Sequence, residues 1–68
     1  MAFKRNDSPL YFITAREAAA IERDGDYGRA AKVWAKANRA SRNPDNQKWS
    51  SVRCDFCMTQ HIRQGANQ

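Results

Sequence analysis

The chain has 68 residues, enough for one domain, and its 12 Lys and Arg against 7 Asp and Glu give a formal net charge of +5 at pH 7. A domain of this size buries only about 60% of the surface that its unfolded chain exposes, so we expect a thin core supported by regular helix packing or by a second copy. Such a chain has no room for a deep pocket, and we expect neither enzymatic activity nor a cofactor.

No stretch of the sequence approaches the length of apolar residues that a membrane span requires. The first seven residues lack the apolar run and cleavage site of a secretory signal. We therefore expect a cytoplasmic protein whose two cysteines are reduced.

Apolar residues recur at helical spacing along most of the chain, and no segment alternates with the period of a strand. The sequence therefore predicts an all-α fold, a compact three-helix bundle over residues 8–63. We expect a flexible N-terminal arm over residues 1–7 and a frayed C-terminal tail over residues 64–68.

The first predicted helix begins at Ser8-Pro9, where Ser is a favoured N-cap residue and Pro suits the first helical position. Thr14 with Glu17 offers an alternative capping box, so two starting points remain open. The helix is expected to end near Asp24.

The first turn of this helix is apolar nearly all round, and one neighbouring helix cannot cover it. Tyr11 shares the core-facing line with Ala15 and Ala18. We expect the other apolar side chains to form an interface at which this helix meets its copy in a symmetric homodimer. The residues of this predicted interface are Leu10, Phe12, Ile13 and Ala20.

A turn separates the first helix from the second, because Gly25 fits the left-handed position after a helix and Asp26 caps the next N-terminus. In the second helix, which is expected to end near Ser41, two aromatic residues alternate with two alanines on one face. This pattern indicates a helix hairpin with aromatic-on-alanine packing, similar to half of a tetratricopeptide repeat. The four residues are Tyr27, Ala30, Trp34 and Ala37.

The opposite face of the second helix is entirely basic. Such a pattern usually indicates a helix face that is exposed to solvent, but these side chains could also contact phosphate groups. Direct DNA binding through this face therefore remains an alternative function. The four residues, called the basic stripe below, are Arg29, Lys32, Lys36 and Arg39.

The third predicted helix begins at Asn43-Pro44, a second pair of cap and first helical residue, and ends near Arg63. Its apolar residues predict a core stripe of Trp49, Val52 and Phe56. The aromatic residues expected to anchor the core of the whole bundle are Tyr11, Tyr27, Trp34, Trp49 and Phe56.

Two charged residues, Glu22 and Arg53, fall on the apolar faces of their helices. A buried charge is costly unless it is paired. We therefore predict an ion pair that joins the first helix to the third. The alternative is that both side chains reach solvent at the rim of the core.

The third helix also carries Cys54, Cys57 and His61 at positions i, i+3 and i+7 of one face. Three such ligands with an open fourth position would describe a catalytic zinc site. Structural zinc sites usually draw ligands from two elements, however, and a redox cysteine pair favours a helix N-terminus. We therefore expect no metal, with Cys57 at the edge of the core and His61 in solvent.

The residues between Tyr11 and Cys57 together form a pattern that resembles the ANR family, small bacterial negative regulators of AraC-type transcription activators. The resemblance implies a cytosolic regulator that binds an AraC/XylS-type activator, often one of virulence genes, and blocks its dimerisation or DNA binding. It also implies that some members contact a histone-like nucleoid protein. The pattern comprises Tyr11, Ala15, Ala18-Ala19, Glu22-Arg23, Gly25-Asp26-Tyr27, Ala30-Ala31, Trp34, Ala37, Asn46, Trp49, Arg53 and Phe56-Cys57.

Two functions of different class follow from the sequence. The first is a protein-binding antagonist of a transcription activator, and the second is a DNA-binding regulator that uses the basic stripe. The third helix begins with Asn43-Pro44-Asp45-Asn46, whose carboxylate would repel phosphate where a recognition helix should read bases. We therefore favour the first function.

Overall fold

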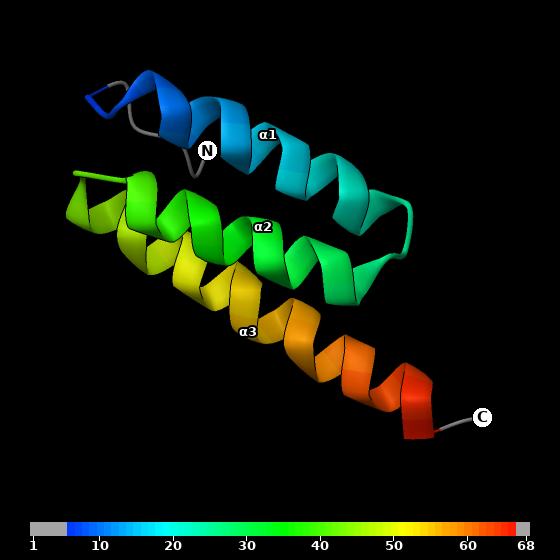
Figure 1. Cartoon of the computed structure of the whole chain (residues 1–68). Helices are drawn as coiled ribbons and strands as arrows, with labels where there is room; N and C mark the ends of the chain where they lie inside the picture. Colours follow the sequence, from blue (N-terminus) through cyan, green and yellow to red (C-terminus); the bar gives the residue numbers. More distant parts are fainter. Residues whose placement is uncertain (1–5, 67–68) are drawn as a thin grey trace.

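The computed structural model describes residues 6–66, which form three helices: α1 (Pro9–Arg23), α2 (Tyr27–Ala40) and α3 (Pro44–Ala66). The three run antiparallel in turn, and α2 lies between α1 and α3 (Figure 1). Residues 6–66 contain no strand. The predicted all-α three-helix bundle is confirmed, while the likeness of α1 and α2 to a tetratricopeptide hairpin stays a prediction.

The helices begin where the sequence places their caps. Side-chain oxygens of Ser8, Asp26 and Asn43 accept backbone N–H groups of the first turns of α1, α2 and α3, at 3.1, 3.4 and 2.9 Å. Gly25, with φ of 84°, provides the left-handed residue after α1. The alternative start at Thr14 is wrong, because its hydroxyl donates to the carbonyl one turn earlier at 2.6 Å.

The third helix extends further than its sequence predicts. α3 continues to Ala66 instead of ending near Arg63, so residues 64–66 are helical, and residues 67–68 lie outside the described part. The side-chain amide of Gln64 donates to the carbonyl of Gly25 at 3.3 Å and ties the last turns of α3 to the α1–α2 turn. Gly65 weakens helix propensity by about 1 kcal/mol, which is too little to end a helix of this length.

The core consists of small residues around two rings. Tyr11 and Trp34 are almost fully buried, and alanines from α1 and α2 fill the space between them. Because an alanine leaves room for a close neighbour, α1 and α2 can pack tightly with little side-chain volume. The buried alanines are Ala15, Ala18, Ala30, Ala31 and Ala37. Tyr27, a predicted core anchor, is only half-buried.

α3 turns a different face to the core from the one predicted. Trp49 and Phe56 remain 37% and 38% exposed and Val52 is 51% exposed, so the prediction that the two rings anchor the core is wrong. Because α2 separates α1 from α3, only the side of α3 that faces α2 is covered, and the rings lie at its edge. The fully buried residues of α3 are Asn46, Ser50 and Cys57.

The exposed edge of α3 is nevertheless ordered by aromatic contacts. The Arg53 guanidinium lies 4.5 Å from the ring centroid of Phe56 and 5.6 Å from that of Trp49. The ring of Tyr27, at the start of α2, meets Phe56 edge-on at 6.1 Å. These rings therefore cover the rim of the core rather than fill it.

Asp7 fastens the chain before α1 to the corner between α2 and α3. Its carboxylate accepts hydrogen bonds of 2.5–2.9 Å from four donors. The donors are the hydroxyl of Ser41, the backbone N–H groups of Arg42 and Ser8, and the side-chain amide of Asn46. The arm expected to be flexible over residues 1–7 is thus held at its last residue, and residues 1–5 lie outside the described part.

Replacing Trp34 by Ala should lower the free energy of unfolding by roughly 3–5 kcal/mol, because the indole is 2% exposed and fills the centre of the core. Trp49→Ala is the matched control, since that ring is 37% exposed, and it should cost about 1 kcal/mol. Urea unfolding followed by circular dichroism measures both. Equal losses in the two variants would contradict the placement of Trp34.

Stability should also depend on the ionisation of Asp7. Burial raises the pKa of this carboxyl, but its hydrogen bonds lower it from 3.8 to about 2. A depressed pKa means that the stabilisation is present above about pH 4 and is lost as the pH falls toward about 2. Asp7→Asn should therefore reduce the free energy of unfolding by roughly 1–2 kcal/mol at pH 7 and by little near pH 2.

Unfolding with urea at these two pH values tests this expectation, with the exposed Asp55→Asn as a control that should change little at either. A loss in Asp7→Asn that stays constant with pH would show that the charge of Asp7 does not stabilise the fold.

Candidate protein-binding surfaces

One carboxylate, that of Glu22, joins all three helices. It accepts hydrogen bonds from the Arg53 guanidinium on α3, from the Trp34 indole N–H on α2 at 3.0 Å and from the Cys57 thiol on α3 at 3.3 Å. The predicted ion pair between Glu22 and Arg53 is therefore confirmed. Sequence reasoning missed the other two donors, although the positions of Trp34 and Cys57 on apolar faces were visible.

The ionisation of this cluster follows from its contacts. Burial raises the pKa of the Glu22 carboxyl, but hydrogen bonds from Arg53, Cys57 and Trp34 together lower it below its ordinary value. Burial raises the pKa of the Cys57 thiol to about 12, and the Glu22 carboxylate adds to this effect. Cys57 therefore stays protonated and acts as a hydrogen-bond donor within the core.

Two of the three candidate zinc ligands, Cys54 and Cys57, donate to different partners. Cys57 donates to Glu22, while the Cys54 thiol donates to the backbone carbonyl of Ala31 on α2 at 3.3 Å. Burial raises the pKa of Cys54 as well, with a smaller effect of the Asp55 charge. Within residues 6–66 no group of three His, Cys, Asp or Glu side chains is placed to hold a metal ion.

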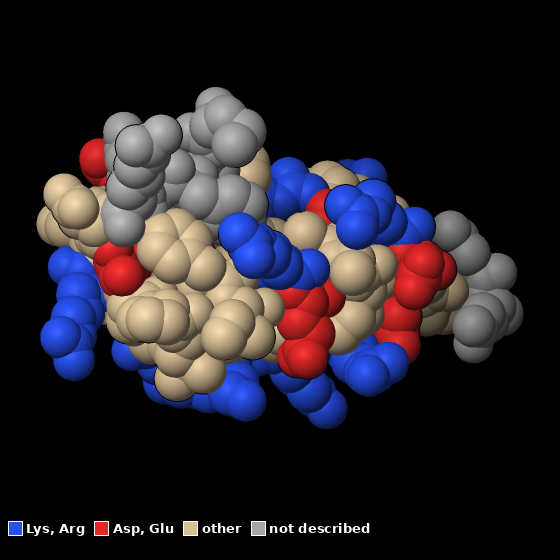
Figure 2. All heavy atoms as spheres, turned by 90° about the horizontal axis from the view of Figure 1, so that it is seen from above, with Lys and Arg blue, Asp and Glu red and all other residues tan. Residues whose placement is uncertain are grey.

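An exposed apolar surface lies on the first turns of α1. Leu10 is 52% and Ile13 is 63% exposed, and Ala20 is exposed two turns further along. Figure 2 shows an uncharged area over the first half of α1, with both basic and acidic side chains at its edges. We call Leu10, Ile13 and Ala20 the α1 patch.

Phe12, the fourth residue of the predicted interface, belongs only partly to this surface. It is half-buried, packs against the core and meets the ring of Tyr11 edge-on at 5.4 Å. At about 100° per residue, Phe12 lies closer around α1 to the buried Ala15 than Leu10 and Ile13 do, which explains this difference.

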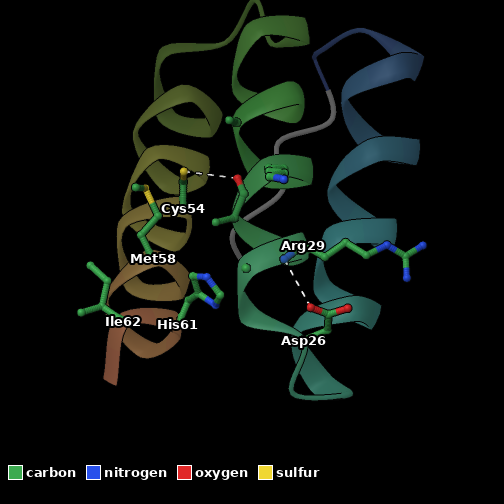
Figure 3. Close-up of a pocket in the computed structure, with 10 residues that line it drawn as sticks. Asp26, Arg29, Cys54, Met58, His61 and Ile62 are labelled. Atoms are coloured by element: carbon green, nitrogen blue, oxygen red, sulfur yellow. Dashed lines mark hydrogen bonds between the residues drawn. The ribbon is translucent and has the colours of Figure 1, made fainter. Parts of the chain in front are cut away.

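A second surface feature is an open groove between α2 and the C-terminal half of α3, with a volume of about 620 Å³ (Figure 3). Met58 and Ile62 lie along its α3 side, and His61 is turned toward α2. The residues that line this α2–α3 groove are Asp26, Gly28, Arg29, Ala31, Lys32, Ala35, Cys54, Met58, His61 and Ile62.

Within the lining of the groove, Gly28 permits a close approach of α2 to the side chain of His61 on α3. A Cβ at this position would lie 2.9 Å from the imidazole ring of His61, so any larger residue would displace the ring. One sign of the groove is visible in the sequence, because Met58 and Ile62 recur at i, i+4 outside the predicted core stripe.

All four residues of the basic stripe are exposed, and two of them, Arg29 and Lys32, line the α2–α3 groove. In Figure 3 the Arg29 side chain extends away from Met58 and Ile62, so it leaves the groove open. Arg29 and Lys32 therefore border the apolar groove, whereas Lys36 and Arg39 lie outside its lining.

No family model matches the chain, and neither a curated protein nor a solved structure matches it. The resemblance to the ANR family accordingly stays a prediction from the residues that carry it. Within the described part of the chain, none of the helices combines the length and apolar character needed to cross a membrane.

Cys57→Ser should keep the fold, because a hydroxyl can donate to Glu22 as the thiol does. We expect a change in the free energy of unfolding of about 1 kcal/mol or less. Cys57→Val fills similar space without a donor and should cost roughly 1–3 kcal/mol. Urea unfolding followed by circular dichroism measures both effects. Equal losses in the two variants would show that the hydrogen bond from Cys57 to Glu22 does not stabilise the fold.

Proposed function

We propose that this protein is a small transcriptional regulator that acts by binding protein, and that it antagonises an AraC/XylS-type activator by blocking its dimerisation or DNA binding. The observation that supports a protein-binding function is the α1 patch, where Leu10 and Ile13 remain 52% and 63% exposed. Clustered aliphatic side chains of this kind usually mark an interface. The identity of the partner rests on the resemblance to the ANR family.

The α1 patch suits two related contacts. In a symmetric homodimer, α1 packs against α1 of a second copy and both patches are covered. The same helix face can accept an amphipathic helix of the activator, since a surface that covers its own copy can also cover a similar helix. In this proposal the activator and the second copy compete for one surface in the cytoplasm.

Charges placed in the α1 patch should disrupt both contacts. We choose Leu10→Glu with Ile13→Glu, because both side chains are more than half exposed, whereas Phe12 packs against the core and its replacement would threaten the fold. The double variant should be a folded monomer by circular dichroism and light scattering, with repression weakened at least about tenfold in a reporter that depends on the activator.

Val52→Glu is the matched control, because Val52 is 51% exposed but lies on α3. It should dimerise and repress like the wild type. A Leu10→Glu, Ile13→Glu variant that stays dimeric and represses normally would place the interface elsewhere.

Direct DNA binding remains a second candidate, since every residue of the basic stripe is exposed. Salt separates the two functions. A protein that makes several phosphate contacts loses orders of magnitude of DNA affinity between low and moderate salt, whereas a mainly apolar protein contact loses far less. Binding of the protein to the activator and to the activator's DNA site, each measured at two salt concentrations, decides between them.

A further inference from the structure

The α2–α3 groove offers an elongated apolar surface between two packed helices. Its floor and walls contain Ala31 and Ala35 on α2 and Met58 and Ile62 on α3. Met58 is 51% and Ile62 is 67% exposed, so both side chains leave aliphatic surface that an occupant of the groove can cover. An occupant that covers them gains about 25 cal/mol for each Å² of apolar area removed from water.

The α2 side of the groove carries more positive than negative charge, with Arg29 and Lys32 against Asp26. Lys32 lines the groove, and the other exposed cations of the basic stripe continue along the same helix. The acidic residue of the lining, Asp26, accepts the backbone N–H of Arg29 as the cap of α2. A partner that lies along the groove therefore meets aliphatic side chains on one flank and cations on the other.

We propose that the α2–α3 groove docks an amphipathic helix of a partner protein, with aliphatic residues at i, i+3 or i+4 and i+7 in the groove and Asp or Glu residues against the basic stripe. This site is separate from the α1 patch and does not depend on the identity of the activator. The aliphatic side of the groove favours a protein helix over nucleic acid, because a phosphate backbone would meet the cations but leave Met58 and Ile62 uncovered.

The test begins with a displayed library of helical peptides in which one face is randomised. Selection on the full-length wild-type protein, with Met58→Glu, Ile62→Glu protein as the counter-selection target, should recover peptides with aliphatic residues at helical spacing beside Asp and Glu. A labelled synthetic copy of a recovered peptide is then titrated with each variant by fluorescence anisotropy.

The Met58→Glu, Ile62→Glu variant should bind this peptide at least about tenfold more weakly than the wild type, while circular dichroism shows an unchanged helix content. Lys32→Gln with Lys36→Gln should weaken binding several-fold and reduce its dependence on salt. The Leu10→Glu, Ile13→Glu variant is the matched control. It should bind the peptide like the wild type, which separates this site from the α1 patch.

Three outcomes would overturn the proposal. The first is that the recovered peptides are basic or carry no aliphatic spacing. The second is that their binding is unaffected by charges at Met58 and Ile62 or is lost in the α1 variant, which would assign the contact to the α1 patch. The third is that a short DNA duplex displaces the peptide and that its binding depends on Lys32 and Lys36 but not on Met58 and Ile62. This result would make the basic stripe a nucleic-acid surface.

Discussion

The fold depends on the contacts of one carboxylate. α1 and α3 are held apart by α2, and Glu22 spans the distance by accepting from Arg53 and Cys57 on α3 as well as from Trp34 on α2. A charge placed on the apolar side of α1 would be costly alone, so its three donors make it a specific link between helices that otherwise meet little. The core consists largely of alanine, whose small side chains do little to determine how the helices align. The hydrogen bonds of Glu22 add a specific constraint on this alignment.

The boundaries of α1 and α2, the start of α3 and the ion pair could be predicted from local chemistry. Caps such as Ser8 and Asn43 act within one turn, and a charge on an apolar face demands a partner wherever the fold places it. The buried face of α3 could not be predicted in this way. Hydrophobicity favoured Trp49 and Phe56, whereas the close approach of α3 to α2 buries the small or hydrogen-bonded side chains of Asn46, Ser50 and Cys57.

Buried polar residues explain this choice of face. The hydroxyl of Ser50 donates to the carbonyl of Asn46 at 2.7 Å, and the side-chain amide of Asn46 donates to Asp7 at 2.9 Å. These partners lie far apart in the sequence or on the backbone of the same helix, so a reading of apolar spacing does not find them. The α2–α3 groove was not predicted either, because its shape depends on how two helices pack against each other.

The unequal lengths of the helices have a dynamic consequence. α3 has 23 residues and α2 has 14, so at about 1.5 Å per residue α3 extends well beyond its neighbour. At one end of the bundle, Asp7 accepts four hydrogen bonds of 2.5–2.9 Å. At the other end, the contact of α3 with the α1–α2 turn is weaker, a hydrogen bond of 3.3 Å from Gln64 to Gly25. We therefore expect the amide hydrogens of the last turns of α3 to exchange with solvent before those of the rest of the bundle. Ile62 lies nearer that end than Met58, which directly follows the fully buried Cys57, so we expect Ile62 to be the more mobile of these two side chains of the groove.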